Sequence, residues 1–129
     1  MSITVEISPG ELVDRITILE IKSERMRDED KRRHVQHELA LSAAARDRAV
    51  PRDQTILERT AALKNVNARL REIEDAIRDC ERARDFGPTF IELARSVYKL
   101  NDERAAVKRE INLVLKSGIV EEKSYQPYR

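Results

Sequence analysis

The sequence is poor in the residues that build disulfide frameworks and β-sheets. Its 129 residues include no Trp, three Gly and one Cys, and aromatic residues make up only 4%. The single Cys80 cannot form an internal disulfide, and so few aromatic residues disfavour a sheet-rich fold or a base-stacking platform. The sequence also lacks an apolar run of membrane-spanning length and a charged leader. We therefore expect a protein in a reducing, cytoplasmic setting that does not insert into a membrane.

Neither sign of charge is in excess. The chain has 25 Lys and Arg against 24 Asp and Glu, for a net charge of +1, which gives no overall attraction to nucleic acid or to an anionic membrane. The three glycines, Gly10, Gly87 and Gly118, all lie where a helix is expected to begin or end, so none belongs to a phosphate-cradling loop. We predict no nucleic-acid partner and no cofactor.

Charged residues, at 38% of the chain, are abundant and alternate with apolar residues at helical spacing. In "SPGEL", Ser8 can cap a helix, Pro9 suits its first position and Glu11 completes a capping box. We expect a first helix over about residues 9–46, which ends before the helix-breaking Pro51. A second helix, over about 53–84, carries apolar residues at alternating spacings of three and four: Leu63, Val66, Leu70, Ile73, Ile77 and Cys80.

A third helix is expected over about residues 89–116, between the "DFGP" turn and the "KSG" ending. The prediction is an all-α single domain over 1–129, an elongated antiparallel three-helix bundle made of a long helical hairpin and an N-terminal helix. Residues 3–7 alternate apolar and polar side chains, which is typical of a strand. They could form a short two-stranded pairing with residues 119 and 120, or the tail over 119–129 could be unattached.

One charged residue interrupts the apolar spacing of the third helix, which runs Leu93, Val97, Leu100, Arg104, Val107, Ile111 and Val114. In an antiparallel three-helix bundle, Arg104 lies almost level with Asp30 on the first helix. An unpaired buried charge is costly, whereas a paired one fixes the register of the helices. We therefore predict a structural ion pair between Arg104 and Asp30, or its neighbour Glu29.

An alternative interpretation is a binding site for a carboxylate or phosphate inside the bundle. The residues that would form it are one stripe of the third helix with a contribution from the first: Asn101, Arg104, Lys108, Asn112 and Arg15, with Lys22 beside them. This arrangement resembles the helical chorismate mutases in architecture, although no motif is shared. We predict no catalytic residue, so the balance is against an enzyme.

Two further candidate sites are weak. His34 and His37 are three residues apart and could reach one metal ion, but no matching cluster accompanies them. Cys80 falls on the apolar face of its helix, where a thiol packs as a small hydrophobic group, and no base is evident beside it. We expect no metal site and no nucleophilic cysteine.

The first helix is apolar on two sides. Ile18 and Ile21 point away from the face formed by Leu12, Ile16 and Leu19, and a helix apolar on two sides needs two partners. The side with Ile18 and Ile21 is either covered by the terminal strands or exposed as a candidate surface for another protein or a second copy of the chain. The favoured function is a non-catalytic interaction or scaffold module that self-associates or binds another protein.

Several segments occur together in one order: "SPGELVDRITILEIKSER", "IEDAIR", "FIELARSVYKLNDERAAVKREIN" and "EEKSY". With them the sequence resembles a family of short bacterial helical proteins known only as a domain of unknown function. That family's pattern has an aromatic residue before "EIED", where this chain has Arg71. The resemblance implies a bacterial, cytoplasmic, helical protein, and it implies no activity and no catalytic residues.

Overall fold

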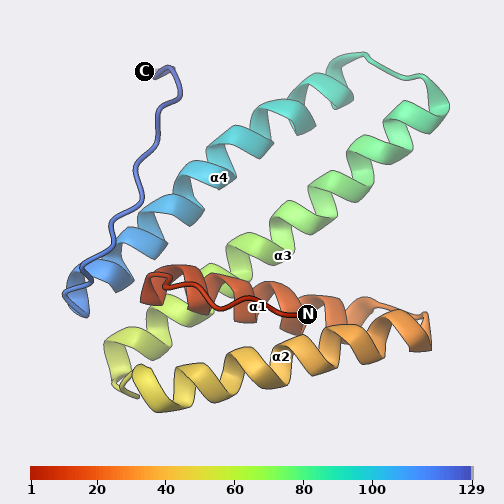
Figure 1. Ribbon diagram of the computed structural model, residues 1–129. Coiled ribbons are helices and arrows are strands. Elements are labelled where there is room, and N and C mark those ends of the chain that lie inside the picture. The colour runs from red at the N-terminus through yellow and green to blue at the C-terminus, as the bar shows by residue number, and fades with distance from the viewer. Residues whose placement is uncertain (129) are drawn as a thin grey trace.

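The computed structural model describes residues 1–128, which form four α-helices joined by short connections (Figure 1). They are α1 (Pro9–Arg25), α2 (Glu29–Ala49), α3 (Gln54–Ala83) and α4 (Pro88–Val114). The all-α class is confirmed. Residues 1–128 contain no strand, and Ile3 and Val5 are 82% and 72% exposed, so the two-stranded pairing of the termini, one of the two alternatives for the tail, is not found. An alternating pattern of five residues cannot form a strand without a partner edge.

The helix expected over residues 9–46 is in fact two helices, which is why the bundle has four helices and not three. Met26 has an extended backbone, with φ −75° and ψ 134°, and ends α1. The Asp28 carboxylate then accepts hydrogen bonds from the backbone N–H groups of Asp30 and Lys31, at 3.0 and 3.1 Å, and so begins α2. Two acids in the first turn of α2 favour the same break because they face the positive end of the helix dipole.

The chain turns back at this break, so α1 and α2 form one antiparallel pair and α3 and α4 form another (Figure 1). Of the four helices, α1 is the one that contacts all the others, and α2 has no buried residue. The apolar core lies near the start of α1 and the end of α4. Its buried members are Val13, Val50, Ile56, Leu63 and Ile111, with Val107 and Leu115 packed against them.

The far half of the α3–α4 hairpin extends beyond α1 and α2 (Figure 1). Consistent with this open shape, the chain exposes 9403 Å² of surface, whereas a compact monomer of 14.9 kDa exposes roughly 7,000 Å². Within residues 1–128 the structure has no helix that is long and apolar enough to cross a membrane.

Candidate functional site

A buried carboxylate, Asp14, lies at the centre of the contact between α1, α3 and α4. Asp14 is only 1% exposed. Arg104 of α4 donates from Nε to one Asp14 oxygen at 2.9 Å and from a terminal nitrogen to the other. The amide of Asn67 on α3 donates to Asp14 at 2.8 Å and to the Thr17 hydroxyl at 2.9 Å, and this hydroxyl donates to the Asp14 carbonyl. Three helices are thus tied to one carboxylate, and its charge is compensated by a bidentate cation.

Arg104 is therefore paired, but with Asp14 and not with Asp30. Asp30 is exposed and binds Arg33 on its own helix, and Glu29 lies 4.0 Å from Arg32. The predicted pairing of Arg104 with Asp30 assumed that residues 9–46 form one continuous helix that runs antiparallel to the second helix. Because the chain turns at Met26, α1 instead runs antiparallel to α4, and Arg104 meets the middle of α1.

A second group of polar contacts joins α1 to α4 and to the C-terminal tail. Lys108 donates to Glu11 at 2.6 Å and to Glu121 of the C-terminal tail at 2.9 Å, and it lies 3.9 Å from Asp14. The Ser8 hydroxyl donates to the other Glu121 oxygen at 3.0 Å. The tail is thereby attached to the start of α1, so the notion of an unattached tail does not fit residues up to Glu121.

The residues of the predicted anion-binding stripe are only partly brought together. Arg104, Lys108 and Asn112 all face α1, where Asn112 accepts a hydrogen bond from the Gly10 N–H at 2.7 Å. Asn101 joins these three residues in lining a groove between α4 and the tail, whereas Arg15 is half-exposed and lies 3.9 Å from Glu11. Since the chain's own carboxylates already bind the two cations facing α1, this stripe is poorly suited to a free anion.

The hydrogen bonds around these cations shift their pKa values. For Arg104, the hydrogen bond to Asp14 raises the pKa of the guanidinium above its usual value. For Lys108, burial alone would lower the pKa of the ammonium, but hydrogen bonds to Glu11 and Glu121 outweigh burial and raise it above the usual 10.5. Both side chains therefore stay charged at neutral pH.

The raised pKa of Lys108 predicts a loss of stability at high pH. A group with a higher pKa in the folded chain stabilises it fully below the unfolded pKa, and this contribution disappears as the pH rises through the folded value. We expect the urea midpoint of the wild type to fall more steeply between about pH 9.5 and about pH 11.5 than that of Lys108→Met. Lys64, whose pKa is raised mainly by its hydrogen bond to Glu24, is present in both proteins and cancels in this comparison. Equal slopes would contradict the prediction.

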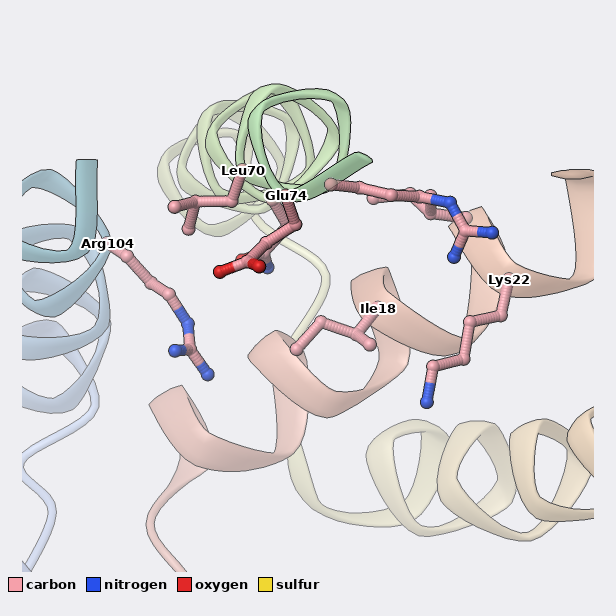
Figure 2. Close-up of a pocket in the computed structure, with 8 residues that line it drawn as sticks. Ile18, Lys22, Leu70, Glu74 and Arg104 are labelled. Atoms are coloured by element: carbon pink, nitrogen blue, oxygen red, sulfur yellow. The ribbon is translucent and has the colours of Figure 1, made fainter. Parts of the chain in front are cut away.

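Beside Asp14, a cavity of about 210 Å³ lies between α1, α3 and α4. Figure 2 shows Arg104 reaching from α4, and Leu70 and Glu74 from α3, toward Ile18 of α1, whereas the side chain of Lys22, which also lines the cavity, points away from them. Ile18 and Ile21, the predicted partner surface, both line this cavity, and Ile21 is only 3% exposed. They therefore do not form an outer surface in this structure, because α1 turns this side toward the other helices.

The other candidate residues predicted from the sequence do not contact Asp14 or the side chains bonded to it. His34 and His37 are exposed on α2, and no group of three or more potential metal ligands occurs within residues 1–128. Cys80 is a buried free thiol on α3. The residues that the sequence prediction missed are Asp14, Asn67 and Glu121. Asp14 does carry a signal, since an acid between Val13 and Ile16 on an apolar helix face is expected to be paired when buried.

The fold and the Asp14 group define a class of protein, an all-α chain of four helices held together at its centre by buried polar contacts. The chain belongs to the family of unknown function DUF6165, whose model matches residues 3–128. No curated protein and no solved structure matches the chain.

Proposed function

We propose that the chain is a non-catalytic helical interaction module that self-associates through the free end of the α3–α4 hairpin. The observation that carries this proposal is the exposed surface of 9403 Å², which exceeds that of a compact monomer by roughly 2,400 Å². A standard protein interface removes about 800 Å² from each partner, so this excess is ample for one.

The free end of the hairpin, which we call the hairpin tip, consists of residues 77–94. It carries two exposed apolar side chains, Phe86 at 50% and Ile91 at 55%, and Phe86 packs edge-on against Phe90 with ring centroids 5.3 Å apart. The hairpin tip is two helices thick, and no other helix in the described chain lies beside it (Figure 1). A two-helix layer with apolar side chains on its outside is stabilised by packing against another such layer.

The occupant we infer is a second copy of the chain. Two hairpin tips packed on each other form a four-helix bundle, in which the same residues contribute from both copies. The net charge of +1 gives little repulsion between copies. The polar contacts around Asp14 then serve to hold the hairpin at a fixed angle to α1 and α2, away from the interface.

The test is the molar mass of the purified chain, measured by light scattering over a range of concentrations. We expect the wild type to approach twice the chain mass of 14.9 kDa and Ile91→Glu to dissociate at least about tenfold more readily, because a charge in a packed apolar interface is costly. The matched control is Leu41→Glu on α2, where Leu41 is 61% exposed and distant in sequence from the hairpin tip. A monomeric wild type, or equal dissociation of the two variants, would refute the proposal.

A further inference from the structure

The 210 Å³ cavity between α1, α3 and α4 combines an apolar wall with an excess of cations. Its apolar wall is formed by Ile18, Ile21 and Leu70. Its polar lining contains three cations and one carboxylate, which are Lys22, Arg71, Arg104 and Glu74, besides the Asn67 amide. A concave site with apolar walls and a few converging polar groups is the usual form of a small-molecule site.

The cationic side chains of this cavity make fewer hydrogen bonds than they are able to form. The Nε of Arg71 is buried and has no hydrogen-bond partner in the described chain. A buried polar atom without a partner is rare in folded proteins and costly, more so when it belongs to a charged group. Lys22 lines the same cavity, and neither a hydrogen bond nor an ion pair joins its ammonium to another residue of 1–128. Arg104 uses two N–H groups on Asp14, and its guanidinium has five.

The balance of charge around the cavity indicates the charge of the ligand that it suits. Lys22, Arg71 and Arg104 are opposed by Asp14 and Glu74, which leaves one positive charge in excess. This balance suits a single carboxylate group, for which guanidinium is the best-matched donor. The volume suits a small apolar body attached to it, since a cavity of roughly 150 Å³ is enough for benzene.

We propose that this cavity binds a small organic monocarboxylate, with its carboxylate on Arg71 and Lys22 and its apolar body against Ile18, Ile21 and Leu70. This site differs from the anion-binding site predicted from the sequence, with which it shares Arg104 and Lys22 as lining residues. It is also independent of the hairpin tip, because no residue of the cavity lies within 77–94.

The probe is benzoate, titrated into the full chain by calorimetry, with neutral benzamide as the matched ligand. We expect saturable binding of benzoate in the millimolar range and no measurable binding of benzamide. Lys22→Met and Arg71→Met should each weaken benzoate binding by about tenfold or more, since each removes a charged donor and keeps an apolar stem. Arg48→Met, an equal charge change at an exposed position of α2, should leave the affinity unchanged.

Thermal unfolding separates loss of binding from loss of folding. Benzoate should raise the unfolding midpoint of the wild type and of Arg48→Met but not of Arg71→Met. Arg71→Met should itself fold with an unchanged or higher midpoint, because it removes an unpaired buried donor. Equal binding of benzoate and benzamide, or an equal loss of affinity in Arg48→Met, would overturn the proposal.

Discussion

Replacing Asp14 with Ala is expected to lower the free energy of unfolding by about 3 kcal/mol. The substitution leaves the Arg104 guanidinium and one N–H of Asn67 without their acceptor at the contact of three helices. Removing one member of a buried ion pair typically costs about 3 to 5 kcal/mol, and the lower end applies here because the Arg104 side chain is 31% exposed. Urea unfolding followed by circular dichroism measures the loss.

Two comparisons separate the cost of an orphaned charge from the cost of losing a contact. Arg69→Met breaks the exposed pair of Arg69 with Glu103, at 3.5 Å, and should change stability by less than about 1 kcal/mol. The double variant Asp14→Leu with Arg104→Met should regain much of the loss, because no buried charge is left unpaired. If Asp14→Ala costs no more than Arg69→Met, the buried group is not a determinant of stability.

Replacing Gly10 with Ala is expected to destabilise the chain by about 2 kcal/mol or more. A β-carbon at Gly10 would lie 2.5 Å from the Lys108 carbonyl oxygen and 2.9 Å from the Asn112 amide oxygen. The first of these atoms is backbone and cannot move alone, so α1 and α4 would have to separate. This separation would also stretch the 2.7 Å hydrogen bond from Gly10 to Asn112. Thermal unfolding of the purified variant measures the effect.

The expected loss of stability in Gly10→Ala is opposite in sign to the usual effect of this substitution within a helix. Within a helix, Ala is normally favoured over Gly by up to about 1 kcal/mol. Gly118→Ala is the control, since nothing lies within 4 Å of the added carbon and Gly118 does not have a positive φ. That variant should be neutral or slightly stabilising. A stabilised Gly10→Ala protein would mean that α1 and α4 do not approach as closely as described.

The two long helices could be predicted from the sequence because their signals are local. Apolar spacing and the Gly87-Pro88 turn give α3 and α4 to within two residues of the bounds found. The break between α1 and α2 has a local signal as well, the acid run from Asp28 to Asp30 after Arg25. However, mixed charges at helical spacing are equally typical of an exposed face on one continuous helix, so this pattern did not predict the turn.

The candidate site shows how one missed turn affects distant contacts. Arg104 stands out in the sequence because it interrupts an apolar face, and the structure indeed pairs it with an acid. Its partner could not be predicted, because which acid faces Arg104 depends on the direction of α1, and this direction depends on the turn at Met26. The contacts of Glu121 could not be predicted either, because the tail has no periodic pattern. Its position depends on hydrogen bonds from Ser8 and Lys108.

The position of α1 also has a consequence for the order of folding during synthesis. The hydrogen bonds that fix α1 join residues 90 and 102 positions apart, Asp14 to Arg104 and Gly10 to Asn112. The α3–α4 contacts, by contrast, span a short connection and close at a small cost in chain entropy. When α1 and α2 have emerged from the ribosome, the other two helices that contact α1, α3 and α4, have not yet been made, so the apolar residues of α1 are covered at that stage only by α2. Of the four helices, α1 is therefore made before the others but reaches its packed position only after α4 has been made.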